Sequence, residues 1–132
     1  MKGVDTNILI RLLTGDDEQQ AKKVYKIFKE AESEKKEFFV PLVVVLELIW
    51  VLESVYEISR TEILESVSDL LLMPVLKFEH PMALQQFLCS AQGNKCELSN
   101  LLIAYAAKIN NCETVLTFDK KASKFNLFEM IK

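Results

Sequence analysis

Short apolar segments alternate with longer amphipathic ones along the whole chain, and this alternation constrains the fold more than any other feature. Residues 38–40, 75–78 and 114–117 are short, apolar and rich in β-branched or aromatic side chains, as is typical of buried strands. Segments with helical periodicity separate them. Parallel strands need such crossovers of a dozen residues or more. The pattern therefore predicts an α/β fold, a three-layer α/β/α sandwich with a central, mainly parallel sheet of four to five strands.

Capping signals divide the helical segments. Gly15 is a natural stop for the first helix, and Asp16 is expected to cap the second. Pro41 suits the first turn of a third helix, and Ser59 with Glu62 has the spacing of a capping box that starts a fourth. No linker, repeat or low-complexity segment interrupts this pattern. We therefore expect residues 1–132 to form a single domain with one hydrophobic core.

The composition argues against several classes of function. The net charge of −3 and the pI near 5.3 disfavour a protein that coats nucleic acid by bulk charge, although a local basic patch is compatible with them. His80 is the only histidine, which disfavours a zinc site or a histidine-based triad. The three cysteines lack C-x-x-C spacing and fit reduced thiols in a cytoplasm. These thiols lead us to expect a cytoplasmic protein. The apolar stretch at 38–52 contains Pro41 and Glu47 and is too short for a membrane span, so we expect it in the core.

Two acidic residues stand just beyond predicted strands. Asp5 lies where a short N-terminal strand would pass into a helix, and Asp119 follows the strand at 114–117. The carboxyl ends of parallel strands share one edge of a sheet, so the two carboxylates are expected to converge there. Each residue also suits an N-cap, and capping is an alternative explanation for either residue taken alone.

Glu47 is the lone charge in residues 42–52, a segment that is apolar on every helical face. A buried carboxylate is strongly unfavourable without compensation, so we expect Glu47 to face a metal ion, an arginine or water in a crevice. An ion pair with Arg11 or Arg60 is the alternative to a metal. Three acids that point to one rim together favour a Mg2+ or Mn2+ site that acts on phosphate esters.

Four segments of the chain occur in the order found in a known family. They are Val4-Asp5-Thr6-Asn7-Ile8-Leu9, Glu47 within an apolar helix, Leu101-Leu102-Ile103-Ala104, and Leu116-Thr117-Phe118-Asp119-Lys120. Over essentially the whole chain they resemble the PIN-domain family, specifically its small VapC-type toxin ribonucleases. The resemblance implies a Mg2+- or Mn2+-dependent endoribonuclease, the toxin of a type II toxin–antitoxin pair. Such a toxin cuts RNA, is usually a homodimer, and is inhibited by a small antitoxin protein.

The resemblance also assigns roles to individual residues. The acids that it implies as catalytic metal ligands are Asp5, Glu47 and Asp119. It implies supporting hydroxyl groups at Thr6 and Thr117, and a brace for the first turn at Asn7.

Asn100 departs from the family pattern, which has an acid at this position of the catalytic group. An amide offers a carbonyl oxygen but no charge, so metal binding should weaken. Glu97 lies within one helical turn, and it either supplies the missing charge to the metal or is an ordinary acid of the first turn. Three explanations are open: a natural variant compensated by Glu97, a naturally weak or inactive domain, and a deliberate near-isosteric substitution that silences a toxic enzyme.

Several cations are candidates for holding the RNA backbone beside this acidic rim. Lys120, Lys121 and Lys124 follow Asp119 closely and are the best candidates, and Lys95 and Arg11 are further ones. A solvated surface turn explains the lysine cluster equally well.

Two other functions compete with the nuclease. A phosphoacceptor or phosphohydrolase domain would use Asp5 as a nucleophile, but such sites generally pair it with a second nearby aspartate, and position 7 is Asn. A catalytically weakened or inactive PIN-like module that binds RNA or protein is favoured by Asn100.

Overall fold

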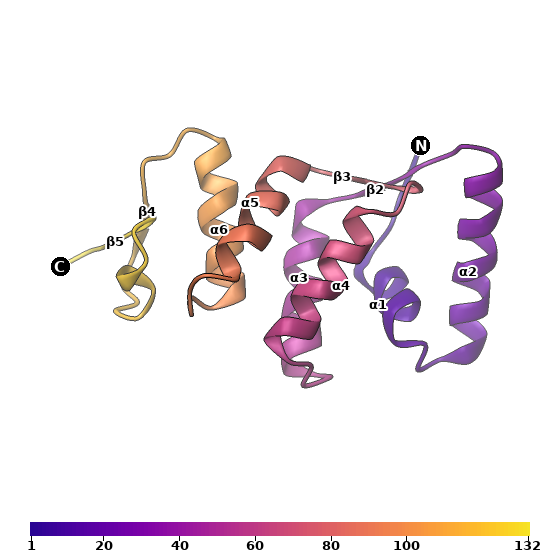
Figure 1. The fold of residues 1–132 in the computed structure, drawn as a ribbon, viewed down its shortest axis with the longest axis horizontal. Helices are drawn as coiled ribbons and strands as arrows, with labels where there is room; N and C mark the ends of the chain where they lie inside the picture. The colour runs from indigo at the N-terminus through magenta and orange to yellow at the C-terminus, as the bar shows by residue number, and fades with distance from the viewer. The chain divides into compact units, whose positions relative to one another are not determined.

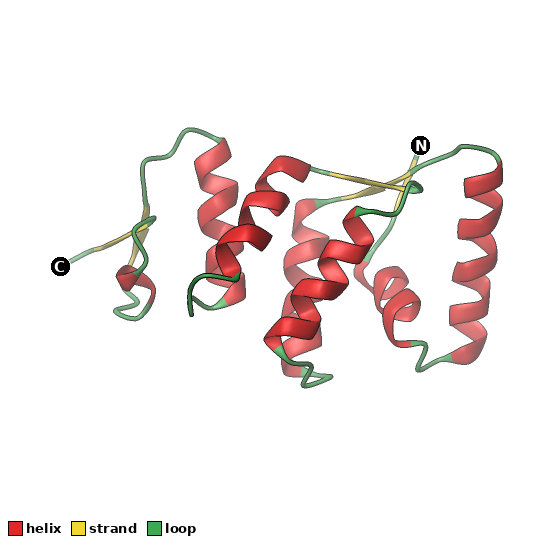
Figure 2. Cartoon of the chain, in the orientation of Figure 1, coloured by secondary structure: helices red, strands yellow, loops and turns green.

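Helices and short strands alternate along the chain, as the sequence predicts (Figures 1 and 2). The computed structural model describes residues 1–132. Its helices are α1 (Thr6–Thr14), α2 (Glu18–Ser33), α3 (Leu42–Ser54), α4 (Arg60–Leu71), α5 (Pro81–Ala91) and α6 (Leu98–Ile109), with a 3-10 helix η1 (Ala122–Lys124). Its strands are β1 (Lys2–Gly3), β2 (Phe38–Val40), β3 (Leu76–Phe78), β4 (Val115–Thr117) and β5 (Phe128–Met130).

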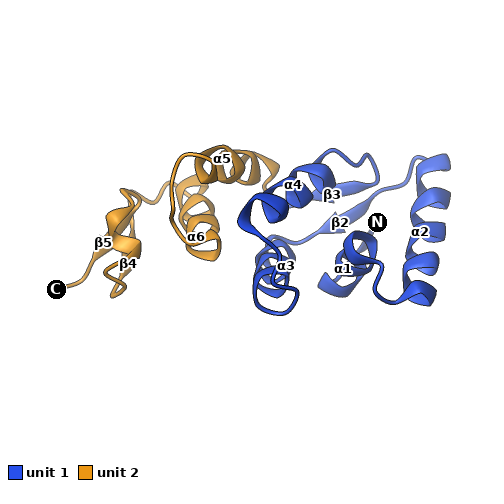
Figure 3. Ribbon diagram, turned by 60° about the horizontal axis from the view of Figure 1, so that its bottom comes forward, with its two compact units in different colours: residues 1–79 blue, residues 80–132 orange.

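The chain forms two compact units, which are drawn in different colours in Figure 3. Unit 1 is Met1–Glu79 and contains β1 to β3 with α1 to α4. Unit 2 is His80–Lys132 and contains α5, α6, β4, η1 and β5. Each unit is described by itself.

All strand pairs are parallel. In unit 1 the strand order is β1-β2-β3, and Phe38 stands opposite Lys2 on one side and Leu76 on the other. In unit 2, β4 pairs with β5, and Val115 stands opposite Phe128. The α/β class and the parallel pairing predicted from the sequence are confirmed, with five strands of two or three residues each.

The core of unit 1 forms where α1 packs against α2 and α3, and where α3 packs against α4. On α2 the buried residues are Val24, Phe28 and Ala31, and the Phe28 ring stacks on Phe38 with 5.2 Å between ring centroids. The side chain of Tyr25, next to these buried residues on the helix, is 57% exposed. It lies beside Lys29, whose amine sits 5.2 Å from the centre of the Tyr25 ring.

The ends of the unit 1 helices follow the predicted capping signals, except that Pro41 is the N-cap of α3 and not part of its first turn, and that α2 has a different cap. Gly15 ends α1 in the left-handed conformation at φ 62°, and the Ser59 side chain caps α4 by accepting from the Glu62 N–H. The predicted cap of α2 at Asp16 is wrong: Asp17 caps this helix instead, because its side chain accepts from the Gln20 N–H over 3.0 Å. The carboxylate of Asp16 is occupied by other partners, described below.

In unit 2, α5 and α6 pack side by side. The buried residues Leu84 and Phe87 on α5 and Leu101 on α6 belong to this core. A second apolar cluster joins Ala104 of α6 to Ala122 of η1 and Phe128 of β5. This cluster holds the segment after β4 against α6. None of the six helices combines the length and the apolar character that crossing a membrane requires.

Candidate active site

Asp5 lies between the end of β1 and the start of α1, as predicted. Its Oδ1 accepts a hydrogen bond from the Ile8 N–H over 3.2 Å, so it is the N-cap of α1. The residue is exposed. Thr6 begins the helix and is only 6% exposed, whereas Asn7 is exposed. The capping role expected for Asp5 is therefore present, and one oxygen of its carboxylate engages a single backbone donor.

Glu47 is exposed on α3, so the prediction of a buried carboxylate is wrong. One face of α3 reaches solvent: Val43 and Trp50, about one turn to either side of Glu47, are 68% and 56% exposed. The apolar composition of α3 suggested burial on every side. Only one face of the helix is buried, and it carries Val45, Leu48, Ile49 and Leu52. Glu47 therefore needs no buried counter-charge. Like Asp5, it belongs to unit 1, where α3 packs against α1.

Arg11 is engaged within unit 1 rather than paired with Glu47. Its Nη1 donates to Asp16 Oδ1 over 2.9 Å, and its Nε donates to Gln20 Oε1 over 2.7 Å. The Tyr56 hydroxyl donates to Asp16 Oδ2 over 2.7 Å, and Thr14 donates to Oδ1. The bonds from Tyr56 and Thr14, with the charge of Arg11, lower the pKa of the Asp16 carboxyl below its ordinary value. This cluster links the α1–α2 loop to the segment after α3.

Glu79 is an acid at the end of β3 that the sequence reasoning did not single out. Its Oε1 accepts a hydrogen bond from the Leu42 N–H, the first residue of α3, over 2.7 Å. Pro41 occupies the N-cap position of α3 and has no side-chain cap bond, so Glu79 supplies one from another strand. The rule that selected Asp5 and Asp119, an acid just past a strand, would also have found Glu79.

Asp119 lies just after β4 in unit 2, as predicted. The Thr117 hydroxyl accepts from the Asp119 N–H over 2.9 Å, and this bond shapes the turn. Asp119 Oδ1 in turn accepts from the N–H groups of Lys121 and Ala122, at 2.9 and 3.3 Å. Oδ1 is thus used to hold the start of η1, while no such bond engages Oδ2. The position reproduces that of Asp5 at the first strand end.

Glu97 and Asn100 stand at the start of α6. Glu97 is the N-cap residue, one position ahead of the first turn in which it was alternatively expected, and its side chain makes no cap bond. The Asn100 amide, Nδ2, donates to Glu97 Oε2 over 3.5 Å, a long hydrogen bond. Glu97 is exposed and Asn100 is half-buried.

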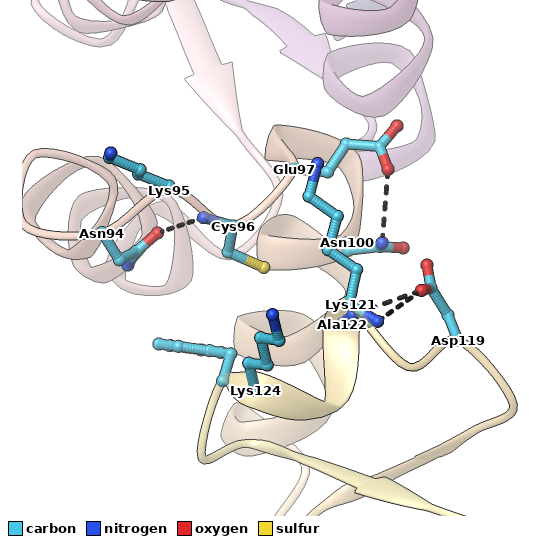
Figure 4. Close-up of a pocket in the computed structure, with 10 residues that line it drawn as sticks. Asn94, Lys95, Cys96, Glu97, Asn100, Asp119, Lys121, Ala122 and Lys124 are labelled. Atoms are coloured by element: carbon cyan, nitrogen blue, oxygen red, sulfur yellow. Dashed lines mark hydrogen bonds between the residues drawn. The ribbon is translucent and has the colours of Figure 1, made fainter.

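A cavity of about 340 Å3 brings the predicted residues of unit 2 together. Glu97 and Asn100 line it from α6, and Asp119 lines it from the end of β4; Figure 4 shows the ends of these three side chains directed toward one another. Lys121 and Lys124 also line the cavity, from the segment around η1. Carboxylate and amine groups therefore face one space.

Two further residues line this cavity: Lys95, which was one of the candidate cations, and Asn94, which was not a predicted site residue. Asn94 shapes the loop before α6, because its Nδ2 donates to the Ser90 carbonyl over 2.8 Å and its Oδ1 accepts from the Cys96 N–H over 2.9 Å. The Gly93-Asn94 pair is a turn signal that marks this loop in the sequence. Lys120, by contrast, was predicted and does not line the cavity.

The donor set in the cavity suits a hard cation. It offers two carboxylates, Glu97 and Asp119, and the amide oxygen of Asn100, which are the ligand types that Mg2+ and Mn2+ prefer. Neither unit alone gathers three His, Cys, Asp or Glu side chains for a metal. The acids Asp5 and Glu47 belong to unit 1, and their expected convergence with Asp119 stays a prediction.

Known proteins match the chain along most of its length. The PIN domain family matches residues 3–126, which include every predicted site residue. The chain belongs to the PIN-domain family. A VapC ribonuclease from Aquifex aeolicus (strain VF5) is 34% identical over 71 residues, which are 54% of this chain and 52% of that protein. The match to this chain thus spans about half the length of this curated relative. The resemblance inferred from the Asp5, Glu47 and Asp119 segments is confirmed at the level of the family.

Proposed function

We propose that this PIN domain is a Mg2+- or Mn2+-dependent endoribonuclease and the toxin of a type II toxin–antitoxin pair. The observation that carries the proposal is the cavity of unit 2, in which Asp119 and the start of α6 face two lysines. The family match over residues 3–126 and the similarity to a VapC ribonuclease support it. A cytoplasmic location, a homodimer and a small antitoxin that covers the active site belong to the same proposal.

The proposed metal ligands are the carboxylates of Asp5, Glu47 and Asp119. A divalent ion, when bound, activates water and offsets the charge of a phosphate. The exposure of Asp5, Glu47 and Asp119 suits ligands that must share an ion with an RNA phosphate. Capping does not compete with this role at Asp119, because Oδ1 alone receives the N–H groups of η1.

The neighbouring polar residues would orient these acids. Thr117 holds the backbone of Asp119 through its hydroxyl group, which gives it a positioning role. Thr6 and Asn7 would have the same task beside Asp5, at the start of α1. Asn100 retains a carbonyl oxygen for the ion but adds no charge.

Lysines beside the acids would hold the RNA backbone. Lys121 and Lys124 line the cavity, and Lys120 is exposed next to them. Their ammonium groups would offset phosphate charge close to Asp119. Arg11 would bind an RNA phosphate only after its guanidinium group had released Asp16.

The substitutions Asp5→Asn and Asp119→Asn test the nuclease. Asparagine caps helices about as well as aspartate, so each variant keeps the cap and loses the charge. We expect cleavage of mixed cellular RNA with Mg2+ or Mn2+ to fall by roughly a hundredfold or more, with little change in the melting temperature. EDTA should abolish cleavage by the unmodified protein.

Asp17→Asn is the matched control, because Asp17 caps α2 in the same way and lies outside the proposed site. It should leave cleavage unchanged. Equal activity in all three variants would remove Asp5 and Asp119 from catalysis. A protein that binds RNA but never cuts it with either metal would instead be the binding module that Asn100 favours.

A further inference from the structure

We infer that Glu97 takes over the metal-binding role of the acid that is missing at position 100, and that Asn100 positions its carboxylate. The inference deepens the proposed function and rests on it, since it names which side chains of unit 2 would hold the ion. The juxtaposition that carries it is Glu97, Asn100 and Asp119 around one cavity.

Helix capping does not explain where the Glu97 side chain lies. Glu97 occupies the N-cap position of α6, yet its carboxylate accepts no bond from the N–H groups of that helix. Glutamate is also a poor N-cap residue, because its longer side chain does not reach these groups as Ser, Thr, Asp and Asn do. Asp5, Asp17 and Ser59 all cap with their side chains in this chain. Of the three acidic N-cap residues, Asp5, Asp17 and Glu97, only Glu97 makes no cap bond, and its carboxylate is directed to the cavity (Figure 4).

Asn100 holds this carboxylate from one side. Its amide nitrogen donates to Glu97 Oε2 over 3.5 Å, and this bond leaves Oε1 for another partner. An aspartate at position 100 could not donate this bond and would face Glu97 as a like charge. The amide therefore permits Glu97 to approach, where an acid at the same position would repel it in the absence of an ion.

The charges around the cavity are consistent with a carboxylate at position 97 in place of one at position 100. Glu97 and Asp119 contribute two negative charges, and Asn100 is neutral. The nearby amines of Lys121 and Lys124 are directed into the same space in Figure 4 and offset part of that charge. Moving a carboxylate from position 100 to position 97 keeps the number of acids that line the cavity at two.

A double-mutant cycle between positions 97 and 100 tests the inference. The full-length chain is compared with Glu97→Gln, Asn100→Asp and the double variant, and the dissociation constant of Mn2+ alone is measured by calorimetry or electron paramagnetic resonance. We expect Glu97→Gln to weaken Mn2+ binding by about tenfold and Asn100→Asp to strengthen it. In the Asn100→Asp background, Glu97→Gln should weaken Mn2+ binding much less, because an acid has been restored at position 100.

Glu113→Gln is the matched control, because it removes the charge of an exposed acid of unit 2 that does not line the cavity. The inference would be overturned if Glu97→Gln changed the Mn2+ dissociation constant no more than Glu113→Gln does. It would also be overturned if Glu97→Gln weakened Mn2+ binding equally in the Asn100 and the Asn100→Asp backgrounds. The variant Asp119→Asn distinguishes a failure of this inference from a failure of the proposed function. If Asp119→Asn weakens Mn2+ binding and Glu97→Gln does not, the inference alone fails; if neither does, the proposed metal site of unit 2 fails and the inference fails with it.

Discussion

At the scale of single residues, Asp119 shows how one carboxylate can serve both structure and chemistry. Oδ1 accepts from two backbone N–H groups of the turn that becomes η1, and the Thr117 hydroxyl holds the Asp119 backbone. These bonds orient the side chain before any ligand arrives, so Oδ2 is presented to the cavity at little further cost in conformational entropy. At the start of α1, Asp5 is held more simply, because its Oδ1 accepts from the single N–H group of Ile8.

Lys121 and Lys124 are the residues whose charge should matter most for RNA binding. Replacing both with Gln should reduce the slope of log Kobs against log salt concentration by roughly 1.4, because each phosphate contact on single-stranded RNA contributes about 0.7. Affinity should therefore fall more at low salt than at high salt. Binding is measured by fluorescence anisotropy in EDTA, so that the RNA is not cut.

Lys23→Gln combined with Lys26→Gln is the control, because both lysines are exposed on α2 in unit 1 and the change in net charge is the same. The slope should stay as in the unmodified protein. If both double variants reduced the slope equally, the effect would be one of net charge and Lys121 and Lys124 would make no local RNA contact.

At the scale of elements, the start of α3 depends on a residue from another strand. Pro41 can supply no side-chain acceptor, and Glu79, 37 residues later than Leu42, accepts from the first N–H of the helix. The charge of Glu79 also interacts favourably with the positive end of the helix dipole. The same helix carries Glu47, so the bond helps to orient a proposed metal ligand.

Glu79→Ala should destabilise the chain by about 1–2 kcal/mol, because it removes a charged cap from a partly buried helix end. Glu79→Gln keeps an acceptor at the same place and should recover a large part of this loss. The free energy of unfolding from urea titration measures both. If the two variants are equally destabilised, charge alone stabilises the helix end; if neither is, the bond contributes nothing.

At the scale of the whole molecule, the family match over residues 3–126 includes most of both units. We propose that residues 1–132 fold as one cooperative domain, as the uninterrupted pattern of the sequence indicates. Trp50 is the only tryptophan and lies in unit 1, so its fluorescence reports on that unit.

Phe87→Ala tests this cooperativity, because Phe87 is fully buried in unit 2. The substitution should lower the free energy of unfolding by about 3–5 kcal/mol. In a single cooperative domain, the Trp50 fluorescence transition should shift to the same lower urea concentration as the circular dichroism transition. Leu48→Ala, in the core of unit 1, is the reciprocal variant and should shift both signals together. A Trp50 transition that Phe87→Ala leaves unchanged would show independent units.

The sequence by itself determined the features that depend on local interactions. The strand and helix alternation, the left-handed end of α1 at Gly15 and the caps at Asp5 and Ser59 all follow from periodicity or from bonds between residues a few positions apart. The strand-end positions of Asp5 and Asp119, and the family itself, were predictable on the same basis.

Only the tertiary structure decided features that depend on which surfaces meet. The exposure of Glu47 depends on which face of an apolar helix is covered, and composition does not contain that information. The role of Asp16 depends on such a contact, because its carboxylate binds Arg11 and Tyr56 and does not cap α2, and the Tyr56 bond spans 40 residues. The cavity that joins Glu97 and Asn100 to Asp119 forms because the segment after β4 packs on α6 through Ala104, Ala122 and Phe128, a contact between residues far apart in the chain.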